Sequence, residues 1–232
     1  MANSNASGIL IQVINLERRP DRLARISAEL QRAGLSFETQ VAVDGQLETH
    51  DPKFISKGAI GCWKSHVNSM RRIVDAKAPF GLILEDDANL STVVNDKFLS
   101  EMLELMKRNQ LDILQIGFIE SLYSVSLRSI TSGPLEFFIA LLRSRGKRDS
   151  SGVRFVLGEF RFGTHAYIVN ASLAEAILEI SPGPPLIPWD DYLGQLAQNQ
   201  MHGEIQIARL VKAVAWQASY QFESLQIDSD IA

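Results

Sequence analysis

The stretch Gly81-Leu82-Ile83-Leu84-Glu85-Asp86-Asp87-Ala88 sets three carboxylates directly behind a short, wholly apolar segment. The residues from Phe80 to Leu84 show no polar alternation, which predicts a strand buried on both faces. In open α/β sheets, ligands bind beyond the carboxyl ends of such strands. Three adjacent acids in that place repel one another unless a cation or the hydroxyls of a substrate share the site. The stretch therefore indicates either a ligand site or an acidic turn that only solvates the end of a strand.

The rest of the chain alternates between strand and helix patterns around this stretch. Helical spacing of apolar residues predicts helices from Pro20 to Gly34, over 60–76, around 98–106, through 174–178 and from Trp189 onward. Apolar runs predict strands over 9–14, 37–43, 80–84, 111–118 and 163–169, and a closing strand or hairpin over 203–216. Such alternation predicts a mainly parallel, Rossmann-like sheet flanked by helices, in a single α/β domain over residues 1–232.

Two segments depart from that alternation. Residues 1–8 form a polar N-terminal tail, and residues 119–160 hold serines, an apolar run over 135–142 and a basic cluster over 143–148. The second segment is interpreted as a surface excursion with one short helix. The alternative is a mobile flap, or a basic and apolar patch that touches an anionic membrane surface.

Composition excludes several classes of protein. The apolar fraction of 46% is ordinary for a globular chain, and the net charge of −4 gives no reason to expect a general nucleic-acid binder. The single cysteine, Cys62, excludes an internal disulfide framework and fits a reducing compartment. The polar N-terminus lacks the pattern of a signal peptide, and no apolar stretch is long enough to span a bilayer. These features predict a cytoplasmic protein, with peripheral contact to the inner membrane as an option.

Six segments, taken in order, resemble glycosyltransferase family 25, which includes bacterial lipooligosaccharide galactosyltransferases and collagen galactosyltransferases. They cover most of the chain outside residues 119–160. The resemblance implies a GT-A fold, a nucleotide-sugar donor such as a UDP-sugar, and Mn²⁺ or Mg²⁺. The matching segments are Val13–Arg22, Ala42–Gly45, Gly58–His66, Leu84–Ala88, Gly163–Tyr167 and Pro188–Asp190.

The resemblance also implies roles for the three acids. In the matching motif the last acid touches the metal, which makes Asp87 the first choice for a direct ligand. Asp86 is then expected to face the ribose hydroxyls, and Glu85 to hold the metal through water. Carboxylate oxygens are the ligands that Mn²⁺ and Mg²⁺ prefer, and a diphosphate is their usual co-ligand. The family motif is Asp-any-Asp, so the longer arm of Glu85 departs from it.

Nucleotide binding requires a different set of groups. Asn15, Arg18 and Arg22 lie in the first strand–helix connection, where helix-start amides and arginines suit a uridine diphosphate. The alternative for the arginines is solvated pairing with Glu17 or Asp21, which stabilises little.

Four further side chains are candidates for the nucleotide-sugar site. Asp44 precedes Gly45 and is a candidate ribose acceptor or base, although Asp-Gly is also an ordinary turn pair. Ser65 and His66 are expected near the start of a helix, where His66 either reaches a phosphate or packs inside. Thr164 is expected to line the pocket.

The acceptor hydroxyl requires a base on the side opposite the leaving group. Asp190 and Asp191 are the candidates, since they follow a proline-rich turn and stand beside Trp189, whose ring is expected to stack on a sugar face. Asp190 is the first choice because it aligns with the Pro-any-Asp of the family. The alternative role for this pair is helix N-capping, which aspartate performs well.

Together these features predict an inverting, metal-dependent hexosyltransferase, a β-galactosyltransferase that uses a UDP-sugar. The expected acceptor is a glycan or glycolipid of lipopolysaccharide, lipooligosaccharide or another surface glycan. Two alternatives remain at this point: a degenerate GT-A fold that binds a nucleotide or a partner, and a two-metal phosphohydrolase, since acid clusters at strand ends serve both chemistries.

Overall fold

The computed structural model describes residues 5, 7–48, 55–119, 146–180, 187–198 and 205–217. Helices and strands alternate along the chain, as the sequence predicts. The helices are α1 (Pro20–Arg32), the 3₁₀ turn η1 (Gly45–Leu47), α2 (Lys57–Asp75), α3 (Asp96–Asn109), α6 (Ala171–Ile180) and α7 (Trp189–Gln198). The strands are β1 (Leu10–Asn15), β2 (Glu38–Val41), β3 (Phe80–Glu85), β4 (Ala88–Leu90), β5 (Ile113–Gly117), β6 (Lys147–Arg148), β7 (Arg154–Leu157), β8 (Ala166–Asn170), β9 (Ile207–Leu210) and β10 (Ala215–Gln217).

One sheet carries all of these strands, in the order β2-β1-β3-β8-β5-β9-β7-β6, with β10 paired to β4 and β5. The expectation of a mainly parallel sheet is wrong, because five of the nine pairings among the described strands are antiparallel. The central strand β8 runs antiparallel to both of its neighbours, β3 and β5. An apolar run reveals that a strand is buried on both faces but not its direction, so the sequence pattern could not distinguish the two arrangements.

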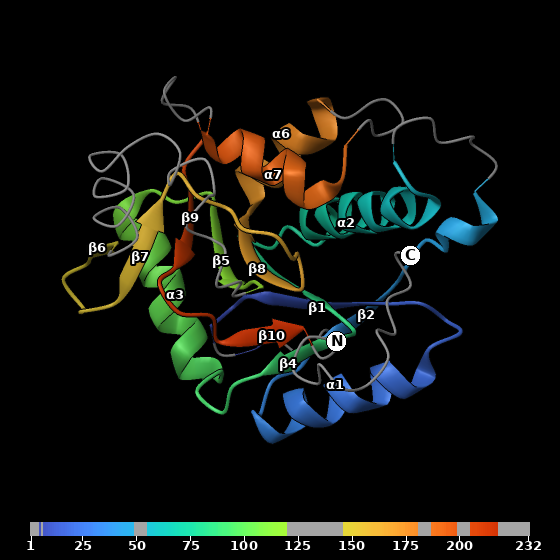
Figure 1. Ribbon diagram of the computed structural model, residues 1–232. Helices are drawn as coiled ribbons and strands as arrows, with labels where there is room; N and C mark the ends of the chain where they lie inside the picture. The colour runs from blue at the N-terminus through green and yellow to red at the C-terminus, as the bar shows by residue number, and fades with distance from the viewer. Residues whose placement is uncertain are drawn as a thin grey trace, which may run out of the picture.

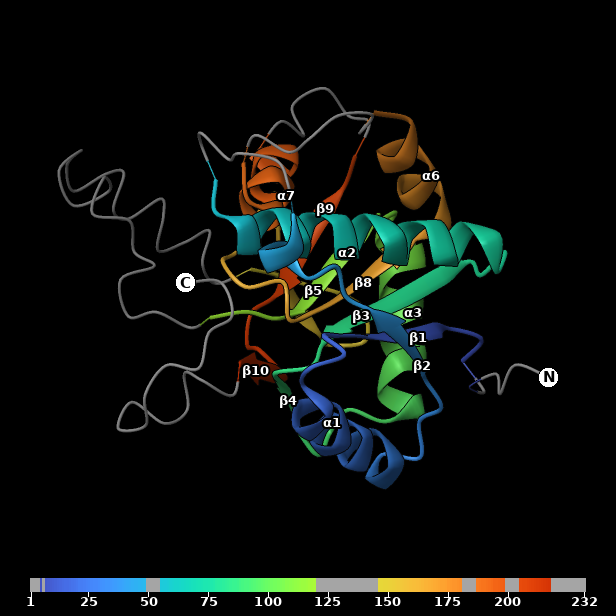
Figure 2. The ribbon, with the colours of Figure 1, turned by 90° about the vertical axis from the view of Figure 1, so that its right-hand side faces the viewer.

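Helices cover both faces of the sheet, as Figures 1 and 2 show: α2, α6 and α7 lie on one face, and α1 and α3 lie on the other. Strand β3 contributes to both cores, because Leu82 and Leu84 pack toward one face and Ile83 toward the other, all fully buried. The predicted strand buried on both faces is therefore confirmed. Helix residues in the two cores include Ile26, Leu30, Leu99, Met102 and Met106 beneath one face, and Met70, Ile73, Leu173, Ile177 and Leu193 above the other.

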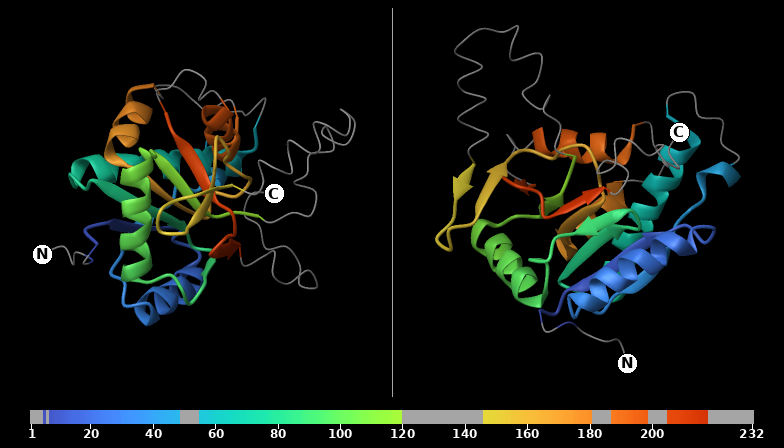
Figure 3. Two further views of the ribbon diagram at one scale, coloured as in Figure 1. Left: turned by 90° about the vertical axis from the view of Figure 1, so that its left-hand side faces the viewer. Right: turned by 60° about the horizontal axis from the view of Figure 1, so that its bottom comes forward.

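The two edges of the sheet are β2 and the short β6–β7 hairpin (Figure 3). Exposed Lys147 and Arg148 form β6, so part of the predicted basic cluster lies on this edge strand. Residues 120–145, which include the apolar run over 135–142 and the start of that cluster, lie outside the described residues. None of the helices within the described ranges combines the length and apolarity needed to cross a bilayer.

The last two strands do not form the predicted hairpin. Strand β9 lies between β5 and β7, whereas β10 pairs with β4 and with Gly117 at the end of β5. Residues 203–204 of the expected closing strand lie outside the described residues, as do residues 182–186 of the proline-rich turn. In the register of β10 with β4, Gln217 lies opposite Ala88, which brings the end of the described chain beside the acidic stretch.

Candidate active site

The acidic stretch lies where the carboxyl ends of β1 and β3 meet. These strands are parallel and end at Asn15 and Glu85, so their following residues emerge at the same edge of the sheet. Strand β8 runs the other way and pairs its first residue, Ala166, with Leu84. The residues just before β8 therefore reach the same edge. Its antiparallel direction is the reason that Thr164 lies at the acidic stretch.

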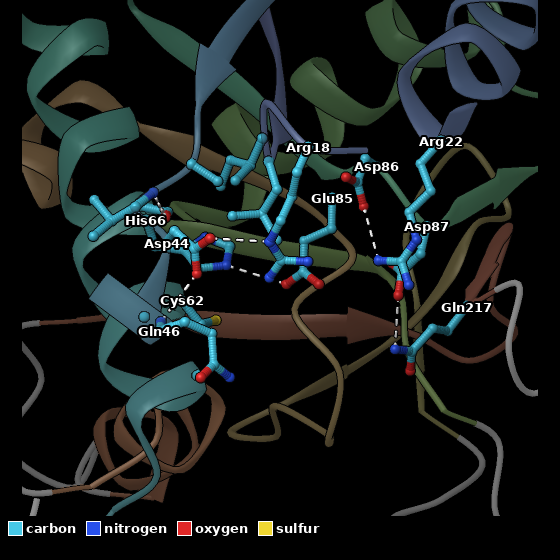
Figure 4. A pocket seen from close by; sticks show the side chains of 17 residues that line it. Arg18, Arg22, Asp44, Gln46, Cys62, His66, Glu85, Asp86, Asp87 and Gln217 are labelled. Atoms are coloured by element: carbon cyan, nitrogen blue, oxygen red, sulfur yellow. Dashed lines mark hydrogen bonds and ion pairs between the residues drawn. The ribbon is translucent and has the colours of Figure 1, made fainter. Parts of the chain in front are cut away.

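The three acids turn in different directions, as Figure 4 shows: Glu85 faces His66, Asp86 faces Arg22, and Asp87 faces Gln217. Each has its own partners, and the three side chains do not gather around one point. The sequence placed them together but gave no information on these directions.

Glu85 stands at the end of a hydrogen-bonded network that runs through the buried side chains of Trp189, Tyr167 and His66. The indole Nε1 of Trp189 donates to the hydroxyl of Tyr167 at 3.3 Å, and this hydroxyl lies 2.9 Å from Nδ1 of His66. Nε2 of His66 lies 3.2 Å from Oε1 of Glu85, and the hydroxyl of Thr164 donates to the same oxygen. Burial alone would raise the pKa of Glu85, but the contacts with His66 and Thr164 outweigh burial and lower this pKa. Glu85 is thus held as a carboxylate.

Trp189 does not serve as the expected stacking surface for a sugar. Its side chain is only 1% exposed, because His66 stacks on its ring at 5.5 Å and the Trp63 ring meets it edge-on at 4.9 Å. The prediction is wrong because a tryptophan in the first turn of α7 packs inward against α2, where the apolar neighbours lie.

Asp86 joins β1 to β3. Its two carboxylate oxygens accept from Nδ2 of Asn15 at 2.7 Å and from Nη1 of Arg22 at 3.3 Å, and its backbone N–H donates to Ile14 at 3.0 Å. Burial raises its pKa, while Asn15 and Arg22 act against that effect. Asn15, Arg22 and Asp86, each predicted to contact the nucleotide, are thus brought together, and Asn15 is buried.

Asp87 has one carboxylate oxygen with a partner and one without. Oδ2 accepts from Nε2 of Gln217 at 2.8 Å, whereas the buried Oδ1 has no hydrogen bond to any described residue. Burial and then the negative charge of Glu85 raise the pKa of Asp87 to about 7. A buried, unpartnered carboxylate oxygen beside a second carboxylate fits a hard divalent cation, which would supply the missing charge and ligand contact. The residues present therefore fit Mn²⁺ or Mg²⁺.

Two pockets adjoin at this point. The first pocket is an open cavity at the ends of β1, β2 and β3. The second pocket opens between the start of α2, the loop before β8 and the start of α7. Cys62, Glu85 and Gln217 line both pockets. A ligand in one pocket can therefore meet a ligand in the other beside Glu85.

The first pocket holds more acids than bases. Arg18 and Arg22 line it together with four carboxyl groups, those of Asp44 and of the acidic stretch. Nε of Arg18 donates to Asp44 at 2.9 Å, and this guanidinium lowers the pKa of Asp44. The arginines therefore pair across the pocket, Arg18 with Asp44 and Arg22 with Asp86. An excess of carboxylates repels a diphosphate unless a cation enters with it.

The wall of the first pocket on α2 is packed very closely. The Ser65 hydroxyl donates to the Gly61 carbonyl at 2.6 Å and accepts from the Val43 N–H at 2.8 Å. A Cβ on Gly61 would lie 2.6 Å from the Val43 carbonyl oxygen, so only glycine permits this approach. Ser65 thus lines the pocket while joining α2 to the loop after β2, and His66, one residue on, has both ring nitrogens occupied.

The second pocket contains both candidate bases. Asp190 and Asp191 lie in the first turn of α7, which begins at Trp189, so neither occupies the N-cap position. Oδ2 of Asp190 accepts from the Gly163 N–H at 3.4 Å, and Oδ1 accepts from the Asp191 N–H at 3.0 Å. Burial and then the charge of Asp190 raise the pKa of Asp191. The pocket thus presents two neighbouring carboxyl groups.

Sequence reasoning missed two residues shared by the pockets. Gln217 lies 130 positions from Asp87 and belongs to no motif. Cys62 was considered only for its redox state, although it stands four residues before His66. That i, i+4 spacing places both side chains on one face of a helix, and it was the signal available in the sequence.

Comparison with known proteins gives the family. A sequence model described as glycosyltransferase family 25 (LPS biosynthesis protein) matches residues 9–193. Procollagen galactosyltransferase 2 of Homo sapiens is 21% identical over 201 residues, which cover 79% of this chain and 29% of that protein. Procollagen galactosyltransferase 1 of Danio rerio is 24% identical over 203 residues, 78% of this chain and 30% of that protein. The chain thus spans less than a third of the length of these curated relatives. Among solved structures, the crystal structure of A197 from STIV aligns with a TM-score of 0.44 and 12% identity, covering 89% of this chain and 82% of that one.

Proposed function

The chain belongs to glycosyltransferase family 25, and from this premise we propose that it transfers galactose from UDP-galactose to a hydroxyl of a saccharide acceptor, with inversion and with a divalent metal. The relatives are procollagen galactosyltransferases by name, which supports galactose as the transferred sugar. A GT-A type of fold is part of this proposal.

The single observation that carries the proposal is the meeting of two pockets beside Glu85. Transfer requires the donor and the acceptor to lie next to each other, each held by its own set of protein side chains. The first pocket has the arginines and acids suited to a nucleotide diphosphate, and the second has the paired carboxyl groups of Asp190 and Asp191. In this assignment UDP lies in the first pocket, the galactosyl group lies beside Glu85, and the acceptor hydroxyl enters from the second.

In the first pocket, Asp87 would hold Mn²⁺ or Mg²⁺ directly and Glu85 would hold it through water. The metal, when bound, stabilises the negative charge that develops on the leaving diphosphate. Arg18 and Arg22 are assigned to the diphosphate and ribose end of the donor. His66 and Thr164 keep the Glu85 carboxylate oriented, because both bind its Oε1.

In the second pocket, Asp190 is proposed to take the proton of the acceptor hydroxyl. It lines this pocket, and its Oδ2 has only a long contact with the Gly163 N–H at 3.4 Å, so this oxygen can accept from a hydroxyl while Oδ1 keeps its bond to the Asp191 N–H. Asp191 raises the negative charge around it and is the alternative base.

The acceptor is proposed to be a glycan or glycolipid of lipopolysaccharide, lipooligosaccharide or another surface glycan, reached in the cytoplasm. The family description as an LPS biosynthesis protein supports this choice. Exposed Lys147 and Arg148 on β6 offer positive charge for peripheral contact with an anionic membrane.

The test is a transfer assay on the purified chain with UDP-galactose, Mn²⁺ and a panel of saccharide acceptors. A first screen measures which nucleotide sugar raises the melting temperature with Mn²⁺, because a ligand of the native state stabilises it. We expect UDP-galactose to give the largest increase. Asp190→Asn should still bind the donor but lose transfer by a factor on the order of 10²–10⁴. Glu175→Gln, an exposed carboxyl on α6, is the matched control.

The outcomes separate the proposal from its alternatives. Donor binding without hydrolysis or transfer to any acceptor would favour a nucleotide-binding module, and phosphate-ester cleavage without sugar transfer would favour a phosphohydrolase. Within the described residues no second group of three close metal-binding side chains accompanies the one at Glu85, which argues against the two-metal chemistry of a phosphohydrolase.

A further inference from the structure

Three side chains of different chemistry converge where the two pockets meet. Sγ of Cys62, a ring nitrogen of His66 and a carboxylate oxygen of Glu85 all lie within 4.8 Å of one another. Cys62 and His66 stand one helical turn apart on α2, and Glu85 ends β3. The face of α2 that packs over the end of β3 therefore brings a sulfur and a nitrogen to the same point as the carboxylate oxygen of Glu85.

This donor set suits a borderline-soft divalent cation. Zn²⁺ takes cysteine sulfur, histidine nitrogen and carboxylate oxygen in tetrahedral sites, whereas Mn²⁺ and Mg²⁺ prefer oxygen alone. Nε2 of His66 and Oε1 of Glu85 are 3.2 Å apart. Two ligands of a tetrahedral Zn²⁺, each about 2.0–2.2 Å from the metal, have nearly this separation. A cation can therefore replace the proton between the two atoms with little movement.

The surroundings hold His66 and Glu85 in place. The Tyr167 hydroxyl lies 2.9 Å from Nδ1 of His66, and Thr164 donates to Glu85. Metal-binding histidines and carboxylates commonly have such outer partners, which fix their orientation. A hydroxyl can donate or accept, so Tyr167 can serve His66 with its proton on either ring nitrogen, including the form in which Nε2 is free for a metal.

The point is accessible from both sides. Cys62 and Glu85 line the first and the second pocket, and Cys62 is half-buried. An ion that enters the first pocket meets all three donors, because His66 lines that pocket as well.

We propose that Cys62, His66 and Glu85 form a binding site for a thiophilic divalent cation, of which Zn²⁺ is the representative, and that its occupancy inhibits transfer. The Cys62 thiol gives its proton to solvent, and the His66 proton moves to Nδ1. Zn²⁺ stands above Mn²⁺ in the general order of affinity for nitrogen and sulfur ligands. The bound cation withdraws Glu85 from the metal assigned to Asp87 and stands between donor and acceptor. The inhibitory half rests on the proposed function, whereas binding does not.

Binding is tested with Co²⁺ on the purified full chain, because a cobalt–thiolate bond gives a charge-transfer absorption band in the near ultraviolet. The chain has one cysteine, so that band reports Cys62. We expect one Co²⁺ per chain with this band, and its loss when Zn²⁺ is added. Cys62→Ser and Cys62→Ala should lack the band. Asp87→Asn should keep it, since Asp87 is not a member of the site.

A wild-type chain without the band, or Zn²⁺ binding that is equal in the wild type and in Cys62→Ser, overturns the site. Inhibition is tested by transfer at saturating Mn²⁺, with each variant compared with its own zinc-free rate. Zn²⁺ should remove most of the wild-type rate and little of the Cys62→Ser rate. Equal loss in both overturns the inhibitory half. A cobalt band in a chain that transfers no sugar would sustain the site while the proposed function fails.

Discussion

Nε2 of Gln217 donates a hydrogen bond to Oδ2 of Asp87 at 2.8 Å, although the two residues are 130 positions apart in the chain. The contact exists because β10 runs antiparallel to β4 with Gln217 opposite Ala88, the residue after Asp87. The amide fixes one oxygen of the carboxylate and leaves Oδ1 for another ligand.

This contact predicts a role for Gln217 in metal binding. Gln217→Ala frees the carboxylate to rotate, and loss of an outer partner of a metal ligand typically costs about 10–100-fold in affinity. We expect Mn²⁺ binding, measured by titration calorimetry with UDP present, to weaken by a factor in that range. Gln40→Ala on the edge strand β2 should bind as the wild type does. Equal affinity in all three proteins would contradict a metal at Asp87.

The Tyr167 hydroxyl predicts a cost in stability. Tyr167→Phe leaves Nε1 of Trp189 and Nδ1 of His66 without their partner in a buried place, and each such group costs roughly 1–3 kcal/mol. At roughly 2–4 °C per kcal/mol for a chain of this size, the melting temperature should fall by about 5 °C or more. Tyr192→Phe is the control, since the Tyr192 hydroxyl makes no hydrogen bond to any of the described residues. A Tyr167→Phe protein with the melting temperature of the wild type would show that the Tyr167 hydroxyl does not join Trp189 and His66 in a hydrogen-bonded network.

The neighbouring acids of the second pocket predict a pH effect. Burial and the Asp190 charge raise the pKa of Asp191, so Asp190→Asn should lower that pKa by removing the like charge. The Asp191 carboxyl resonance, followed by NMR across acidic pH, should then titrate at lower pH than in the wild type. Glu175→Gln should leave this titration unchanged. An unaltered Asp191 titration in Asp190→Asn would mean that burial alone sets the pKa.

The metal-free chain should lose stability as pH rises. The pKa of Asp87 is about 7 in the fold against 3.8 for an ordinary aspartate, so between these values the folded chain binds more protons than the unfolded chain. The free energy of unfolding therefore falls over that range and stays low above it. Asp87→Asn removes this fall, so with chelator present the variant should be the more stable protein above pH 7. Urea unfolding below and above pH 7 measures this, and parallel pH profiles would refute it.

The sequence predicts the elements of this fold well and their directions poorly. Pro20 at the start of α1 and Gly34 in a left-handed conformation just after it, with φ +70°, delimit the helix as expected, since both signals act locally. The apolar run of β3 likewise identifies a strand covered on both faces. The direction of β8 is fixed by its pairing with β3 and β5, which the local pattern does not contain.

The candidate site likewise has residues that the sequence identifies and contacts that it does not predict. Glu85 and Asp86 were identified because they follow a buried strand, but their partners depend on which elements pack against that strand's end. Trp189 was expected at a sugar, yet its ring packs between His66 and Trp63. Gln217 had no local signal, because its position follows from the register of β10 with β4.

The most direct test of the central claim is calorimetric titration of UDP into the wild type and into Asp87→Asn, each with and without Mn²⁺, with Glu101→Gln as an exposed-carboxyl control. We expect Mn²⁺ to strengthen UDP binding in the wild type and in the control but not in a folded Asp87→Asn. Binding of UDP that is strengthened equally in all three proteins, or in none, would contradict it.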